Sequence, residues 1–296
     1  MARGHVLYNP KAGNGNGQKE AEQLRQKMTE ELVYHDVTQI SDYAQFFAEI
    51  PQEDFLVIAG GDGTLNRFAN DTADVQISQQ ILYFPSGTDN DFAREMGVAP
   101  TEKAFEVTKY LKDLPMAEIK GKRYHFINGV GFGIDGYCCE VGDELRKIPG
   151  KKVDYTAIAI KGLLFHYNPT KAKITVDGQT YEYDNVWLAP TMFGKHYGGG
   201  MIPTPQQTRD DPEQKLSVMV FRGRSRLLTL CIFPSIFKGQ HVKHNKKVFV
   251  HSGHHITVEF DSPRSLQVDG ETILDVTGYT ACSAKCLAET KETATV

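Results

Sequence analysis

A glycine-rich turn with one carboxylate, residues 60–64 (Gly-Gly-Asp-Gly-Thr), is the part of this sequence best suited to chemistry. It follows directly on the apolar residues 55–59, which are typical of a buried parallel strand. Glycine tolerates positive φ and leaves no Cβ between the backbone and a ligand. Backbone amides in such a turn, with a helix N-terminus behind them, form an anion site. The spacing matches neither G-x-G-x-x-G nor the Walker loop, so the turn predicts phosphate binding of another kind.

Two further glycine loops have the same character. Residues 9–17 (Asn-Pro-Lys-Ala-Gly-Asn-Gly-Asn-Gly) contain Asn9, which can both donate and accept hydrogen bonds with a nucleotide. Residues 85–92 (Pro-Ser-Gly-Thr-Asp-Asn-Asp-Phe) contain Asp91, which could cap a helix or hold a metal-bound water near phosphates. Each loop alone reads as an ordinary strand-to-helix turn. Together, the three loops favour a site for nucleotide phosphates.

The elements around these loops alternate between strand and helix patterns. Strands are expected at residues 5–8, 34–38, 55–59 and 81–84, and helices at 18–32 and 43–50. This rhythm predicts an α/β domain over residues 1–122, with an open, mostly parallel sheet and helices on both faces. Ligands bind beyond the carboxyl ends of strands in such sheets, and all three loops fall there.

The pattern changes near residue 124, where short β-like runs separated by Asp-Gly turns take over. Residues 123–288 are therefore expected to form a mainly antiparallel β-sandwich or barrel, interrupted by helices at 153–167 and 224–237. The polar tail, residues 289–296, is expected to fray.

The composition fits an ordinary two-domain globular protein: 296 residues, 40% apolar and 24% charged. The formal net charge of −4 argues against nucleic acid as the main partner. The sequence has no signal peptide, and no apolar run approaches the ~18 residues that span a bilayer. Its five cysteines are expected to be reduced thiols, which together with these absences predicts a cytoplasmic protein.

The three loops resemble the three motifs of the diacylglycerol kinase catalytic domain, whose superfamily also contains soluble bacterial lipid kinases, sphingosine kinases and ceramide kinases. The resemblance continues through residues 127–135 (Ile-Asn-Gly-Val-Gly-Phe-Gly-Ile-Asp), residues 198–201 (Gly-Gly-Gly-Met) and residues 268–271 (Val-Asp-Gly-Glu). It therefore spans nearly the whole chain in the family's order. It implies an NAD kinase-like fold for the first domain and a lipid-substrate domain for the second.

The resemblance implies ATP-dependent phosphorylation of the hydroxyl of diacylglycerol, or of a related long-chain lipid alcohol, in a cleft between the domains. Glu271 would be the general base, with Asp62 and Asp91 as further catalytic residues. Phosphoryl transfer needs a positioned nucleophile, Mg²⁺ on the phosphates and stabilisation of developing charge. An Asp-Gly pair before Glu271 is also a common hairpin turn. The expected nucleotide contacts are Asn9, Pro10, Gly13, Thr38, Gly60, Gly61, Asp62, Gly63, Thr64, Asn66, Gly87 and Thr88.

The sequence departs from the family pattern in places. Arg67 stands where a glutamate is usual and could contact ATP or pair with a neighbouring acid. The family's Asp-Asp-Gly turn appears as residues 210–215 (Asp-Asp-Pro-Glu-Gln-Lys), without the glycine. Asp210, Asp211 and Glu118 are the candidate metal ligands, against the alternative of a solvated acidic loop.

Other interpretations remain open. One is a NAD kinase-like phosphotransferase, and another is a nucleotide-binding regulatory protein whose catalysis has decayed. The apolar residues 227–237 and the lysines that follow predict reversible contact with the inner face of a membrane, where a lipid substrate resides. A core helix followed by a solvated loop would give the same pattern. Edge strands of the second domain would also allow two subunits to pair as a homodimer.

Overall fold

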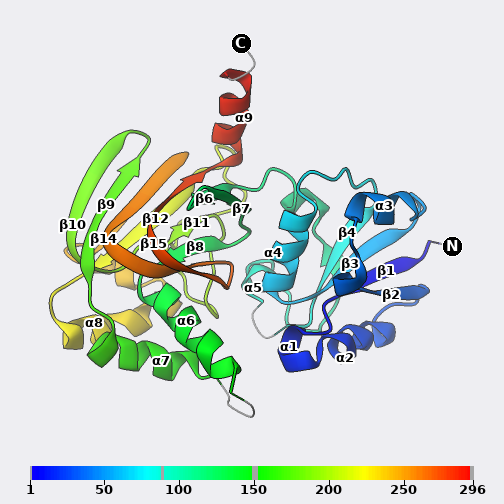
Figure 1. The fold of residues 1–296 in the computed structure, drawn as a ribbon, viewed down its shortest axis with the longest axis horizontal. Helices are drawn as coiled ribbons and strands as arrows, with labels where there is room; N and C mark the ends of the chain where they lie inside the picture. Colours follow the sequence, from blue (N-terminus) through cyan, green and yellow to red (C-terminus); the bar gives the residue numbers. More distant parts are fainter. Residues whose placement is uncertain (1, 88–89, 149–152, 294–296) are drawn as a thin grey trace. The chain divides into compact units, whose positions relative to one another are not determined.

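The computed structural model describes residues 2–87, 90–148 and 153–293, and the chain divides into two compact units, Met1–Asp113 and Leu114–Val296 (Figure 1). The boundary lies before the expected residue 122. The reason is strand pairing: β6 (Met116–Ile119) pairs with β15 (Glu271–Cys282), and β7 (Lys122–His125) pairs with β6.

The first unit contains a five-stranded sheet in the order β2-β1-β3-β4-β5. The strands are β1 (Gly4–Tyr8), β2 (Leu32–Asp36), β3 (Phe55–Gly60), β4 (Gln80–Pro85) and β5 (Phe105–Glu106). The first four are parallel and β5 is antiparallel to β4, which confirms the open, mostly parallel sheet. Its helical segments are α1 (Ala12–Gly15), α2 (Gly17–Glu22), η1 (Gln23–Gln26), η2 (Val37–Gln39), α3 (Tyr43–Ala48), α4 (Asp62–Asp71), α5 (Asp91–Glu95) and η3 (Thr108–Tyr110).

Alternation along the strands supplies both faces of this sheet with apolar side chains. Val57 and Phe84 pack with Leu24 of η1 on one face. Tyr83 points to the other face, where its ring contacts Phe92 of α5 at a centroid distance of 6.0 Å. The helix expected over residues 18–32 ends earlier, because Leu32 pairs with Gly4 and belongs to β2.

The second unit is built on a ten-stranded sheet in which every pairing is antiparallel. β14 (His255–Val268) pairs with β15, with β8 (Gly129–Phe132) and with β9 (Thr170–Val176), and its pairing with β9 closes part of the sheet on itself. The mainly antiparallel β-domain is thereby confirmed. Its remaining strands are β10 (Gln179–Leu188), β11 (Thr191–Met192), β12 (Leu216–Arg222) and β13 (Val248–Gly253).

The helices of the second unit cover a second apolar core, in which Trp187 and Leu163 are fully buried. The expected helices at 153–167 and 224–237 are present, each ending in a different helical form. The segments are α6 (Ile134–Arg146), α7 (Tyr155–Lys161), the π-helix η4 (Gly162–His166), α8 (Arg226–Ile232), the 3₁₀ segments η5 (Phe233–Lys238) and η6 (His241–Lys243), and α9 (Ala284–Thr293).

Helix α9 extends into the polar tail as far as Thr293, and fraying of that tail stays a prediction. Ser283 explains where this helix starts. Its amide donates to the His254 carbonyl, and its hydroxyl accepts from the Cys286 amide at 3.3 Å. A buried serine therefore caps the helix and fixes it to the sheet.

Candidate active site

The three glycine loops lie at one edge of the first sheet. Tyr8 of β1 is in register with Ala59 of β3, and Gly60 is in register with Pro85 of β4. Because these strands are parallel neighbours, the segments that follow Tyr8, Gly60 and Pro85 leave the sheet side by side. The first unit therefore brings together the loops that the sequence singled out.

The loops after β3 and β4 touch through their backbones. The Ser86 amide donates to the Gly60 carbonyl at 3.0 Å. A Cβ added to Gly87 would lie 2.3 Å from the Gly61 nitrogen, so a side chain there would force the two loops apart. Gly60 is equally confined, with Thr64 Oγ1 2.4 Å from the position of its missing Cβ. Thr88, the last of the expected nucleotide contacts, lies outside the described residues.

The first turn of α4 is suited to bind an anion. Gly61 precedes it in an extended conformation and, being a glycine, offers no side-chain cap. A helix leaves the N–H groups of its first turn without intrahelical acceptors, and its dipole attracts negative charge there. Glycines without room for a Cβ next to such a turn form a cradle that a phosphate fits.

Asp62 links the two loops. Its carboxylate accepts hydrogen bonds from the amides of Asp91 at 2.6 Å and Phe92 at 3.3 Å, so it stabilises the start of α5 from the first turn of α4. Asp91 is also buried, and its Oδ1 lies 3.5 Å from Arg94 Nε. Burial and these two carboxylates raise the pKa of Tyr83 far above its ordinary value. The structure thus gives Asp62 an organising role, and a role in catalysis stays a prediction.

The loop after β1 is organised by Asn9. Its side-chain oxygen accepts from the Lys11 amide at 3.0 Å, and its carbonyl accepts from the Ala12 amide at 3.1 Å. Pro10 occupies the turn between them. Gly13 has a φ of +57°, in the left-handed region that favours glycine.

The other expected nucleotide contacts in the first unit have distinct settings. Asn66 is buried in α4 and accepts from the Asn70 side-chain amide at 3.1 Å. Thr38 follows β2, with its amide and hydroxyl both bonded to Asp36. Arg67 is exposed on α4. Burial raises the pKa of Asp71, and the nearby Arg67 charge opposes that shift. Arg67 therefore acts on a neighbouring acid.

Glu271 lies in the second unit, directly after the turn that joins β14 to β15. Asp269 and Gly270 both have positive φ, as a tight hairpin turn requires. The buried Asp269 carboxylate accepts hydrogen bonds from the amides of Ile127, Asn128 and Gly129 at 2.5, 2.9 and 2.9 Å. Burial raises the pKa of Asp269, and these amides oppose that shift. The turn is thereby fixed to the segment before β8.

Two buried residues that the sequence reasoning missed support this turn. Arg209 donates to the Ile127 carbonyl and, at 2.7 Å, to the Asn128 side-chain oxygen. Gln267 accepts from the Gly270 amide at 2.7 Å, and its side chain also bonds the buried carboxylate of Asp135. Asp135 falls in the 127–135 motif, which was the one available signal for it.

Asp135 makes the stability of the second unit dependent on pH. Burial raises its pKa to about 6. A folded pKa above the unfolded value means that stability falls as pH rises from about 4 to about 6. Asp135→Asn removes this titration, so the variant should gain ~2 kcal/mol relative to wild type between pH 4.5 and 7.5. Urea unfolding followed by fluorescence of Trp187, the single tryptophan, measures it, and a pH-independent difference would contradict the shift.

The three candidate metal ligands do not gather into one site. Across the described ranges, no group of three or more His, Cys, Asp or Glu side chains could hold a metal ion. Asp211 accepts from the amides of Glu213 and Lys215, which organises its own loop. Asp210 is exposed, and Glu118 lies on β6 opposite Thr280.

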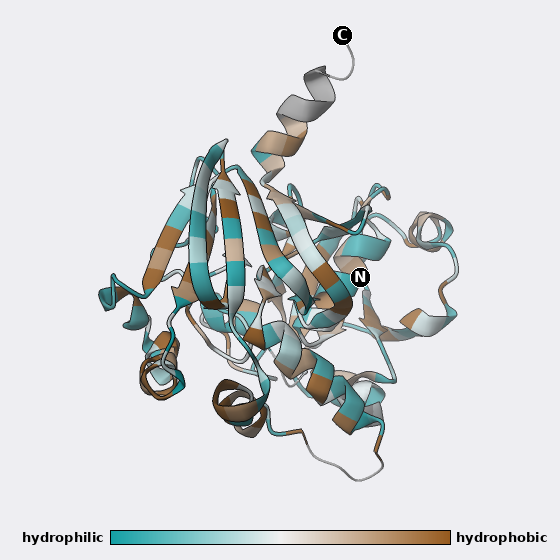
Figure 2. Ribbon diagram, turned by 60° about the vertical axis from the view of Figure 1, so that its left-hand side comes forward, coloured by the Kyte–Doolittle hydropathy of each residue, from teal (hydrophilic) through white to brown (hydrophobic). Residues whose placement is uncertain are grey.

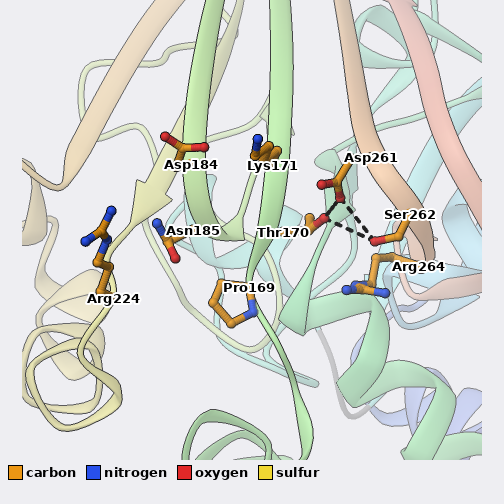
Figure 3. A pocket seen from close by; sticks show the side chains of 9 residues that line it. All are labelled: Pro169, Thr170, Lys171, Asp184, Asn185, Arg224, Asp261, Ser262 and Arg264. Carbon is orange, nitrogen blue, oxygen red and sulfur yellow. Dashed lines mark hydrogen bonds between the residues drawn. The ribbon is translucent and has the colours of Figure 1, made fainter.

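A polar pocket of about 600 Å³ in the second unit lies apart from these residues (Figure 3). Thr170, Asp261 and Ser262 form a hydrogen-bonded group on one side, and Arg224 lines the other. None of the predicted site residues lines it, so we assign it no part in the candidate site.

Known proteins match the chain along most of its length. Residues 3–117 match the diacylglycerol kinase catalytic domain, and residues 128–288 match the YegS C-terminal NAD kinase beta sandwich-like domain. A diacylglycerol kinase of Bacillus subtilis (strain 168) is 24% identical over 284 residues, which cover 92% of this chain and 90% of the relative. A second relative, from Staphylococcus aureus (strain MSSA476), is named as a provisional lipid kinase. It is 31% identical over 238 residues, which cover 75% of this chain and 72% of the relative.

A crystal structure shares the fold. It is that of a diacylglycerol kinase from Bacillus anthracis str. Sterne, with a TM-score of 0.61 and 22% identity, covering 95% of this chain and 94% of that one. The matched domains, their order and the relatives agree with the motifs in the loops. The chain belongs to the bacterial lipid kinase family, in which a diacylglycerol kinase catalytic domain precedes a β-sandwich domain.

Proposed function

We propose that this protein transfers the γ-phosphate of ATP to the hydroxyl of diacylglycerol or a related long-chain lipid alcohol. The observation that carries the proposal is the contact between the glycine loops after β3 and β4, whose backbones approach too closely for a Cβ at Gly87. Such a cradle beside the first turn of α4, which begins after a glycine, suits a nucleotide triphosphate. Family membership supports the lipid acceptor.

In this proposal the first unit holds the nucleotide. Amides of the Gly60–Thr64 turn and of the loop around Gly87 bind the phosphates, and Asn9 contacts the nucleotide from the first loop. Asp62 keeps the start of α5 next to α4, through its bonds to the Asp91 and Phe92 amides. The rigid loops place the γ-phosphate before reaction, which lowers the entropic part of the barrier.

Mg²⁺ would neutralise charge on the phosphates, and it usually binds proteins through only one or two carboxylates plus phosphate oxygens. Asp91 has a buried carboxylate and lies at the sheet edge that carries the glycine loops. We propose that this carboxylate is the protein's contribution to the Mg²⁺ site, with the remaining ligands supplied by phosphates and water. Asp210, Asp211 and Glu118 remain candidates in the second unit. The three do not form a cluster of protein ligands, but a Mg²⁺ site needs only one protein carboxylate, so any one of them could still serve.

Glu271 is the proposed general base. Its carboxylate takes the proton of the lipid hydroxyl as the hydroxyl oxygen bonds to the γ-phosphorus and ADP leaves. Asp269 and Gln267 hold the turn that presents it.

Phosphate transfer from γ-labelled ATP tests the proposal, with diacylglycerol, sphingosine, undecaprenol and NAD as acceptors in mixed micelles. We expect labelled product from diacylglycerol or another lipid, abolished by EDTA and restored by excess Mg²⁺. Labelled NAD alone would assign a NAD kinase activity. Intact ATP binding without transfer to any acceptor would assign a regulatory, non-catalytic protein.

A further inference from the structure

The second unit exposes large apolar side chains on neighbouring helical segments. Six of the nine exposed large hydrophobic residues among the described ranges lie on α7, η4, α8 and η5, and five of these six have wholly apolar side chains, Tyr155 being the exception. Phe165 is 72% exposed and Leu227 is 69% exposed, the two largest values of the nine. We call this set the apolar edge; its members are Ile160, Phe165, Leu227, Leu228 and Phe237.

Hydrogen bonds hold the segments of the apolar edge together. Arg226, next to Leu227, donates to the carbonyls of Leu163 and Tyr167 at 2.9 and 2.8 Å and to the Asn168 side chain at 2.6 Å. These bonds fix the start of α8 against η4, which carries Phe165. Figure 1 shows α7 and α8 near each other at one end of the second sheet, and Figure 2 colours the helices at that end largely hydrophobic. The edge is therefore a preformed surface.

The segment of the apolar edge that contains α8, η5 and η6 carries charge of one sign. Residues 223–247, which include α8, η5 and η6, contain six Lys and Arg and no Asp or Glu. This is unusual in a chain with 37 acidic residues and a net charge of −4. Lys238, Lys243 and Lys246 are exposed. Apolar side chains bordered by cations on a helical surface are typical of segments that lie in a lipid headgroup layer.

We propose that the apolar edge docks this protein on an anionic phospholipid bilayer, with Phe165 and Leu227 inserted among the acyl chains and the lysines against the headgroups. This inference rests on the proposed function, because a lipid kinase must reach a hydroxyl that resides in a bilayer. No helix in the described part of the chain is long and apolar enough to span one. Pairing of two copies through this edge would set its cations against each other, because a two-fold interface brings a surface onto itself.

Sedimentation with vesicles, without ATP, tests the apolar part of this surface. On phosphatidylcholine vesicles containing phosphatidylglycerol, the double variant Phe165→Ser/Leu227→Ser should partition about tenfold or more weakly than wild type. Leu274→Ser is the matched control, since Leu274 is 51% exposed on β15, outside the edge, and should bind as wild type does. Equal binding by wild type and the double variant would overturn the proposal.

The cations are tested by Lys238→Glu/Lys243→Glu. On anionic vesicles this variant should lose about 25-fold or more in partitioning, since each of the two lysines near such a surface contributes about fivefold. The control Lys103→Glu/Lys112→Glu makes the same charge change in the first unit and should bind normally. Binding that does not depend on phosphatidylglycerol would overturn the electrostatic part.

Two measurements separate this proposal from its competitors. Light scattering of wild type and Phe165→Ser/Leu227→Ser should give the same mass, and a smaller mass for the variant would assign the edge to a second copy. Transfer to a short-chain diacylglycerol in detergent should be unaffected by the variants. If the edge variants lose vesicle binding, the docking proposal is supported even when no phosphate transfer to lipid is found. The docking proposal and the proposed kinase function can therefore fail independently.

Discussion

Glu271→Gln should lower kcat for lipid phosphorylation about 10³-fold, the range for loss of a general base. Glutamine has nearly the same shape but cannot take the proton of the lipid hydroxyl. ATP affinity should not change, because the expected nucleotide contacts all belong to the first unit. Single-turnover kinetics with labelled ATP and nucleotide titration by calorimetry separate these effects.

The folded state should tolerate this change. Glu271 is exposed at the start of β15, and the turn before it is fixed by Asp269. Asp275→Asn is a suitable control, since it removes another exposed carboxylate of the same strand and should leave kcat unchanged. Near-normal turnover by Glu271→Gln would mean that another group accepts the proton.

The α/β half of the fold was predictable because its signals are local. A short apolar run that ends in glycine, as at residues 55–61, determines a buried strand and the turn after it, and parallel order then places three such turns at one edge. The limits of the helices were less predictable. Leu32 fits a helical period, yet its pairing with Gly4 places it in a strand, and only the tertiary structure decides this.

The second unit was predictable in class and less so in detail. Strand β15 gives a weak sequence signal because its apolar residues alternate poorly, and it is held by pairing with β14 and β6. Helix α6 was missed because its glycines and cysteines give a weak helical signal.

Support for the Glu271 turn comes from residues distant in sequence. Arg209 lies 82 residues from the Ile127 carbonyl that it bonds, and the Asp269 carboxylate lies 142 residues from the Ile127 amide. Periodicity and local motifs carry no information on such pairs, so the sequence alone singled out a candidate base and not the residues that position it.

Asp62→Asn should damage both nucleotide binding and stability. Asp62 is buried, and its carboxylate accepts hydrogen bonds from the amides of Asp91 and Phe92. The uncharged asparagine side chain would lose these charge-assisted hydrogen bonds, which are worth ~1.5–3 kcal/mol. We expect the melting temperature to fall by about 5 °C. Because the carboxylate joins the loop of β3 to that of β4, kcat/KM for ATP should fall about 100-fold. Thermal unfolding and steady-state kinetics measure the two effects.

Asp74→Asn is the matched control, because Asp74 is an exposed aspartate shortly after the same helix. It should leave both quantities unchanged. The comparison also distinguishes two functions of Asp62. If its carboxylate only organises the loops, saturating ATP should restore most of kcat in the folded variant. If it also acts on the transferring phosphate, kcat should stay low at every ATP concentration, as for Glu271→Gln. Unchanged melting temperature and kinetics would show that the bonds to α5 are dispensable, and the link between the two loops would then have to come from the backbone contact at Gly87.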